Sequence, residues 1–138
     1  MKYGMIAILL LVLACPAMAE WTIVGSYPII GKASGLASYG TYLYYGIYGS
    51  DGGRVFRFDP ATGQETLLFN NTSINDSYGM GHDGQHLWIT DHGTSSSAPA
   101  YTLKLDLTGN IVSQFNLPDH YMSGIAPDNG DFWVMTYY

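Results

Sequence analysis

The chain has 138 residues, a formal net charge of −6 at pH 7 and a single cysteine. With five Lys and Arg residues and no basic cluster it is a poor partner for phosphate backbones, which excludes nucleic-acid binding. Charged residues make up 12% of the chain and aromatic residues 14%, a balance that excludes a disordered polymer. The length suits one small domain.

Residues 1–19 are predicted to be a secretory signal peptide. Lys2 precedes the apolar run from Met5 to Ala14, and the small residues of Ala17-Met18-Ala19 follow. This order of charge, apolar run and cleavage site is typical of export signals. The run is also shorter than the ~20 residues that a helix needs to cross a bilayer. We therefore expect cleavage after Ala19, a secreted or periplasmic mature protein and no membrane span.

Cys15 offers an alternative. Val12-Leu13-Ala14-Cys15 resembles a lipobox, in which Cys15 would be lipidated and would anchor the protein at a membrane surface. Cleavage after Ala19 instead removes this cysteine, the single one in the chain. The mature protein would then be held by its core, by metal or by oligomerisation rather than by a disulfide.

Three segments of the remaining chain repeat one pattern. In each, a glycine begins an apolar triplet, a turn with a second glycine follows, and a longer apolar run comes next. The triplets begin at Gly35, Gly79 and Gly124, a period of about 45 residues, and such a period indicates a repeat architecture.

Each repeat is predicted to contain four short antiparallel strands. The pairs Asp83-Gly84 and Asn129-Gly130 supply the positive φ that a tight hairpin between the first two strands requires. A second turn, from Asp59 to Gly63 in the first repeat, reverses the chain after the third strand. Four antiparallel strands in every 40 to 50 residues are the signature of a β-propeller blade.

The chain is therefore predicted to be all-β, a partial β-propeller of about two and a half four-stranded antiparallel blades after an N-terminal ring-closing strand. Its domain spans residues 20–138, with the closing strand at 21–30, blade one at 35–69, blade two at 79–115 and half of blade three at 124–138. Propellers have typically 4 to 8 blades. Either the chain is part of a longer propeller, or copies of it assemble by self-association through the open blade edge.

Two segments carry a family resemblance. Leu87-Trp88-Ile89-Thr90-Asp91 and Lys104-Leu105-Asp106-Leu107-Thr108-Gly109 resemble the repeats of NHL-type, gluconolactonase-like and glutaminyl-cyclotransferase-like propellers. The resemblance implies a propeller over residues 21–138 and says little about activity. The acidic residue of the cyclotransferases would fall near Tyr44-Tyr45, and the metal-holding Glu of the gluconolactonases near Ser34. This chain thus lacks a key residue of each of these two enzyme families, so we expect no catalytic residue, metal or cofactor.

The candidate binding residues lie in loops that propellers place on one face, where ligands usually sit. They are Tyr48, Asp51, Tyr78, Asp91 and His92. The alternative is a solvated polar loop. We expect a binding or scaffold role with a carbohydrate or protein ligand. Two other hypotheses are the N-terminal part of a propeller enzyme, of lactonase, cyclotransferase or lyase type, and an oligomeric sugar-binding propeller.

Histidines and aromatic residues give two further expectations. His82, His86 and His92 do not have a spacing that implies three or four converging metal ligands, so ordinary surface or strand-end positions are expected for them. Tyr44, Trp88 and Trp133 occupy one repeat position in the second strand. This equivalence predicts that they pack between blades.

Overall fold

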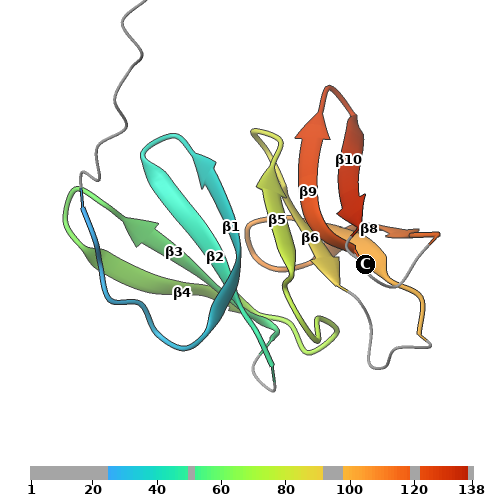
Figure 1. Cartoon of the computed structure of the whole chain (residues 1–138). Coiled ribbons are helices and arrows are strands. Elements are labelled where there is room, and N and C mark those ends of the chain that lie inside the picture. The colour runs from blue at the N-terminus through green and yellow to red at the C-terminus, as the bar shows by residue number, and fades with distance from the viewer. Residues whose placement is uncertain (1–24, 50–51, 92–97, 119–121, 137–138) are drawn as a thin grey trace, which may run out of the picture.

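The computed structural model describes residues 25–49, 52–91, 98–118 and 122–136, and their regular structure is entirely β (Figure 1). The strands are β1 (Ala33–Tyr39), β2 (Tyr42–Ile47), β3 (Arg54–Asp59), β4 (Gln64–Asn70), β5 (Gly79–His82), β6 (Leu87–Asp91), β7 (Tyr101–Leu105), β8 (Ile111–Asn116), β9 (Met122–Asp128) and β10 (Asp131–Thr136). In these ranges no helix is long and apolar enough to cross a membrane.

The strands form three antiparallel sheets that follow the sequence repeat. Blade one has the order β1-β2-β3-β4, blade two β5-β6-β7-β8, and blade three pairs β9 with β10. The first strands of the blades are neighbours, since β1 contacts β5 and β5 contacts β9. Figure 1 shows the sheets succeeding one another from left to right. This arrangement confirms the predicted all-β partial propeller of about two and a half blades.

The turns form for the local reasons that the sequence suggests. Gly84 and Gly130, at the hairpins of blades two and three, have φ values of +95° and +97°. Asp83 Oδ1 accepts hydrogen bonds from the backbone N–H groups of Gln85 and His86 at 2.9 and 2.7 Å. An aspartate that bonds to the backbone ahead of it, followed by a glycine with positive φ, fixes the turn and the register of the strands beside it.

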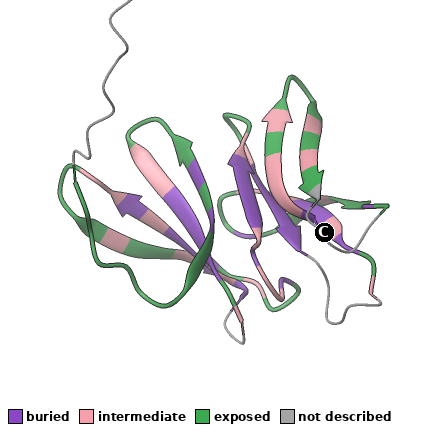
Figure 2. Ribbon diagram, in the orientation of Figure 1, coloured by how far each residue is buried: buried purple, intermediate pink, exposed green. Residues whose placement is uncertain are grey.

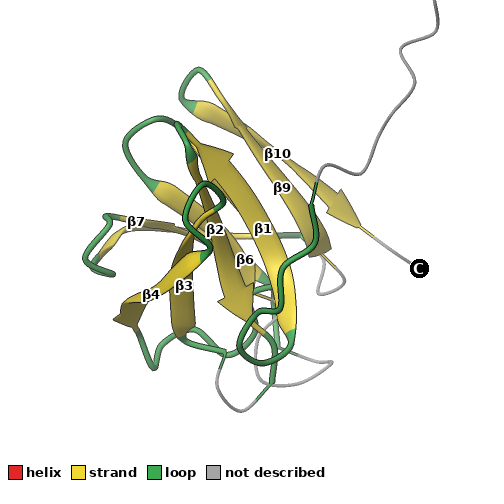
Figure 3. Ribbon diagram, turned by 90° about the vertical axis from the view of Figure 1, so that its left-hand side faces the viewer, coloured by secondary structure: helices red, strands yellow, loops and turns green. Residues whose placement is uncertain are grey.

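The sequence predicted a closing strand at 21–30, and for the residues of this segment that the structure describes the prediction is wrong. Residues 25–30 form no strand, and residues 21–24 lie outside the described residues, as does the predicted signal peptide. Tyr27 packs its ring on Phe58, with centroids 4.9 Å apart, and its hydroxyl donates to the carbonyl of Pro60 at 3.0 Å. Figure 3 shows this segment crossing the face of blade one. A segment that lies over a face leaves its backbone without a ladder partner and therefore stays irregular.

The core lies between blades and contains the aromatic position that the repeats share. Tyr44 of β2 is buried and contacts His82 of blade two, with ring centroids 5.4 Å apart. Trp88 is 2% exposed and contacts Phe132 of blade three, with centroids 5.2 Å apart. These contacts confirm packing between blades for Tyr44 and Trp88. Trp133 is 71% exposed, because no described strand faces it.

The repeated glycine of each triplet explains how closely the blades approach. A Cβ atom built on Gly79 would lie 2.4 Å from the backbone oxygen of Ser123, and one on Gly35 would lie 2.9 Å from that of Ser77. Neither glycine has a positive φ, so close approach rather than backbone conformation requires it. The glycine that defines the sequence repeat is therefore the contact point between neighbouring first strands.

Candidate ligand-binding face at the loop end of the blades

The blades have two different ends. The hairpin turns after β1, β5 and β9 gather at one end, at the top of Figure 1, and the C-terminal ends of β2, β4 and β6 lie at the other. We call this second end the loop end. It holds the described candidates Tyr48, Tyr78 and Asp91, while Asp51 and His92 lie outside the described residues.

Tyr48 and Tyr78 come together at the loop end from different connections. Their ring centroids are 5.5 Å apart with an interplanar angle of 88°, an edge-to-face pair. Tyr48 is 43% exposed and Tyr78 is half-buried. One ring is thus supported by the other and still presents apolar surface to solvent.

The backbone around this aromatic pair is held from several sides. Asp76 Oδ1 accepts a hydrogen bond from the N–H of Gly49 at 2.7 Å, which joins the two connections. The buried Ser77 hydroxyl donates to the carbonyl of Gly52 at 3.1 Å. The N–H of Tyr78 donates to the carbonyl of Thr90 at 3.0 Å. Hydrogen bonds therefore fix the backbone that carries the aromatic pair.

Asp91 lies beneath this face and is fully buried. Its Oδ2 accepts hydrogen bonds from the N–H of Asn75 at 2.6 Å, from the N–H of Asp76 at 3.3 Å and from the Tyr101 hydroxyl at 3.1 Å. Burial, together with the charge of Asp91, raises the pKa of Tyr101 to about 12. In this structure Asp91 supports the connection between β4 and β5, so we place it under the candidate face rather than on it.

Asn75 and Tyr101 are supporting residues that sequence reasoning missed. The Asn75 side-chain amide donates to the Tyr101 hydroxyl at 3.2 Å, and that hydroxyl also bonds to the carbonyl of Ser73 at 3.1 Å. The sequence did contain a signal for this contact. An aspartate ends one strand and a tyrosine begins the next, and adjacent antiparallel strands place two such positions opposite each other. Asp91 is indeed the register partner of Tyr101.

The histidine-containing cluster lies at the opposite end. Asp83 Oδ2 accepts from the indole N–H of Trp88 at 2.8 Å and pairs with Lys104 Nζ at 3.3 Å. Burial lowers the pKa of His82, whose Nδ1 accepts from the N–H of Gly84 at 2.8 Å. These contacts give the cluster a role in the hairpin turn. Across the described part of the chain, no three His, Cys, Asp or Glu side chains are grouped to hold a metal ion.

The fold and this face define a propeller-type protein, and comparison with known proteins agrees. No family model matches the chain. It is similar to protein STRICTOSIDINE SYNTHASE-LIKE 3 of Arabidopsis thaliana, at 28% identity over 94 residues. The match covers 66% of this chain and 23% of the relative, so the chain spans about a quarter of the relative's length. That relative has a six-bladed β-propeller fold, which supports the blade assignment. The NHL-type and gluconolactonase-like resemblances stay predictions.

Proposed function

We propose that this chain is an exported propeller module that binds carbohydrate through its loop end. The observation that supports this most directly is the pair of Tyr48 and Tyr78, in which one ring is supported edge-on and the other is exposed. A sugar ring has an apolar C–H face that packs on such a ring, and hydroxyls that bond to the polar groups of the surrounding connections.

The polar groups beside this pair favour binding over catalysis. The hydroxyls of Ser34 and Ser77 donate to backbone carbonyls, and the Asp91 carboxylate accepts from backbone N–H groups. Nucleophilic catalysis needs a hydroxyl or thiol within hydrogen-bond reach of a general base. Among the described residues of this face, the Ser34 and Ser77 hydroxyls are bonded to backbone carbonyls. The Tyr101 hydroxyl does lie 3.1 Å from the Asp91 carboxylate, but Asp91 is fully buried and the pKa of Tyr101 is raised to about 12, which disfavours a nucleophilic role.

A panel of immobilised glycans tests the proposal. The purified full chain should be retained on a subset of sugars, and Tyr48→Ala should weaken that binding by about tenfold or more, the cost of losing a stacking aromatic. Tyr39→Ala is the matched control, because Tyr39 is also an exposed tyrosine of blade one but lies at the hairpin-turn end. Equal binding by Tyr48→Ala and wild type, or equal loss in both variants, would exclude this face.

Export is part of the proposal and has its own test. N-terminal sequencing of the protein recovered outside the cytoplasm should begin at Glu20, because the small residues at 17–19 form the cleavage site. A lipidated Cys15 at the new N-terminus would instead establish the anchored form. Labelling with palmitate, lost in Cys15→Ala, is the measurement that detects that form.

The comparison with a strictosidine synthase-like protein motivates a second candidate function. In it, the chain provides the first blades of a propeller enzyme of lactonase, cyclotransferase or lyase type, and other blades carry the catalytic groups. Sequencing the transcript beyond codon 138 discriminates the two. Further units of about 45 residues with clustered Glu, Asp or His would favour the enzyme. A stop codon directly after codon 138 would oppose it.

A further inference from the structure

The chain at and after the end of β4 contains three acceptor sequences for N-linked glycans, each with the pattern Asn-x-Ser/Thr. They are Asn70-Asn71-Thr72, Asn71-Thr72-Ser73 and Asn75-Asp76-Ser77. In an exported protein such a sequence can receive an oligosaccharide, which is bulky and needs a position on the surface. The folded structure therefore decides which of the three asparagines can carry one.

Asn75 belongs to the hydrogen-bonded network beneath the loop end. Its side-chain amide donates to the Tyr101 hydroxyl at 3.2 Å, and its backbone N–H donates to the buried Asp91 at 2.6 Å. The hydroxyl of its acceptor sequence, that of Ser77, is fully buried and donates to the carbonyl of Gly52. An oligosaccharide on the Asn75 amide would have to displace Tyr101 and open this network to solvent.

Asn71 is half-buried where blade one meets blade two. Its Nδ2 donates to the carbonyl of Gly109, in the turn between β7 and β8, at 2.9 Å, and its Oδ1 accepts from the N–H of Ser73 at 2.9 Å. Gly109 itself is tightly packed, since a Cβ atom built on it would lie 2.6 Å from Cγ of Phe69. An oligosaccharide on the Asn71 amide would therefore push the two blades apart.

Asn70 differs from both, because its side chain is exposed. It ends β4, the outermost strand of blade one, whereas the first strands β1 and β5 meet on the inner side. In the part of the chain that the structure describes, no hydrogen bond holds its side-chain amide. Thr72, the hydroxyl residue of its acceptor sequence, is exposed too. Figure 2 shows β4 mainly in the colours of exposed and intermediate residues.

The repeat shows that a further blade beside blade one would leave Asn70 exposed. Its repeat equivalent is Asn116, since each of the two follows a phenylalanine at the end of a fourth strand. Asn116 is the register partner of Tyr101, which packs against the core between blades one and two. Blade one covers that face of blade two, and Asn116 is nevertheless exposed. The exposure is thus a property of this position on the outer strand.

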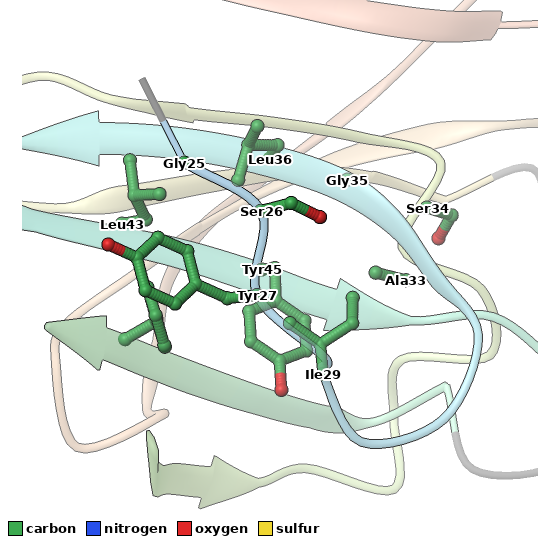
Figure 4. Close-up of a pocket in the computed structure, with 11 residues that line it drawn as sticks. Gly25, Ser26, Tyr27, Ile29, Ala33, Ser34, Gly35, Leu36, Leu43 and Tyr45 are labelled. Carbon is green, nitrogen blue, oxygen red and sulfur yellow. The ribbon is translucent and has the colours of Figure 1, made fainter. Parts of the chain in front are cut away.

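The N-terminal segment does not reach Asn70 either. Figure 4 shows Tyr27 and Ile29 of this segment beside Tyr45, and the pocket of about 360 Å³ at this place is lined on blade one by residues of β1, β2 and β3. The segment contacts β4 through the N–H of Ile30, which donates to the Glu65 carboxylate at 3.4 Å. Glu65 lies about 16 Å from Asn70 along the strand, at about 3.3 Å per residue.

We propose that Asn70 is the attachment site of an N-linked glycan and that Asn71 and Asn75 carry none in the folded protein. The donor is an oligosaccharide on a lipid diphosphate. Nδ2 of Asn70 forms a bond to the anomeric carbon of the sugar and releases one proton. The bond from that carbon to the diphosphate breaks, and the lipid diphosphate leaves with the electron pair. The site rests on the proposed export, because exported chains meet this donor, and not on carbohydrate binding at the loop end.

Intact mass of the full chain secreted from a cultured eukaryotic cell tests the site. The mass should fall when an N-glycan amidase is added, and Thr72→Ala should abolish that fall. Ser73→Ala is the matched control, because it removes the acceptor sequence of Asn71, keeps that of Asn70 and is also a change at an exposed hydroxyl. We expect Ser73→Ala to behave like wild type. The amidase converts a modified asparagine to aspartate, so peptide mapping should find this conversion at Asn70.

Three results would overturn the proposal: a secreted chain whose mass the amidase does not change, a mass change that survives Thr72→Ala, or conversion at Asn71 or Asn75. A chain that stays inside the cell contradicts the proposed export instead. The site is then tested on residues 20–138 joined to an established signal sequence, with the same two variants and the same expected outcomes.

Discussion

Replacing Gly79 by alanine perturbs the point where two first strands come closest. The new Cβ would lie 2.4 Å from the backbone oxygen of Ser123 and 3.0 Å from the Cα of Gly124. An ordinary contact of this kind is at least 3.4 Å. Because both neighbours are backbone atoms, no side-chain rotation relieves the contact, and β5 and β9 must move apart.

The expected cost follows from that displacement. Overpacking of this kind costs about 1–3 kcal/mol, and the smaller conformational entropy of alanine in the unfolded chain returns about 0.4–1 kcal/mol. We expect Gly79→Ala to lower the free energy of unfolding by about 1–2 kcal/mol. Gly124→Ala is the matched control, because its Cβ would meet only the flexible side chain of Met135, at 3.3 and 3.5 Å. We expect its effect to stay within about 0.5 kcal/mol.

Urea unfolding followed by tryptophan fluorescence measures both variants. With an m value of about 2 kcal/mol/M, the urea midpoint for Gly79→Ala should fall by about 0.5–1 M. The midpoint for Gly124→Ala should stay near that of wild type. Equal midpoints for the two variants would refute the reasoning, because the close approach of β5 to β9 would then carry no energetic cost.

Two further outcomes are expected, at the buried Asp91 and at the partly buried His82. Asp91→Ala should lower the free energy of unfolding by about 3 kcal/mol in the same assay, because the N–H groups of Asn75 and Asp76 lose their acceptor. Asp91→Asn should cost less. A loss under about 1 kcal/mol for Asp91→Ala would contradict the supporting role of this residue. Burial lowers the pKa of His82, so the unfolded chain binds its proton first, and stability present above the unfolded pKa of 6.5 is lost as the pH falls below it. His82→Asn should therefore lose less stability than wild type between roughly pH 7.5 and pH 5.5, and parallel stability curves would contradict this.

Local chemistry made the strands and hairpin turns predictable. The Asp83-Gly84 pair specifies its turn through a side-chain acceptor and a positive φ, both of which depend on adjacent residues. The shared position of Tyr44 and Trp88 also predicted burial between blades, because a repeat places equivalent residues in equivalent contacts. Trp133 has the same position but is exposed, since what covers it depends on a neighbour and not on its own sequence context.

The candidate face was predictable in part. Tyr48 and Tyr78 were expected at one end because the connections after β2 and β4 must emerge there, and the structure brings their rings together. The burial of Asp91 was not predictable, because it depends on the connection between β4 and β5 folding back over the end of β6. That fold is set by contacts such as Asn75 to Asp91, which sequence periodicity does not register.

The most direct test of carbohydrate binding at the loop end is a titration of the isotope-labelled full chain with the sugar that the glycan panel selects, followed by amide chemical shifts. We expect the shifts to concentrate at the loop end, around Tyr48, Gly49 and Tyr78, with little change at the hairpin turns of Gly40 and Gly84. Shifts concentrated at those turns, or no sugar that binds at all, would contradict the proposed function.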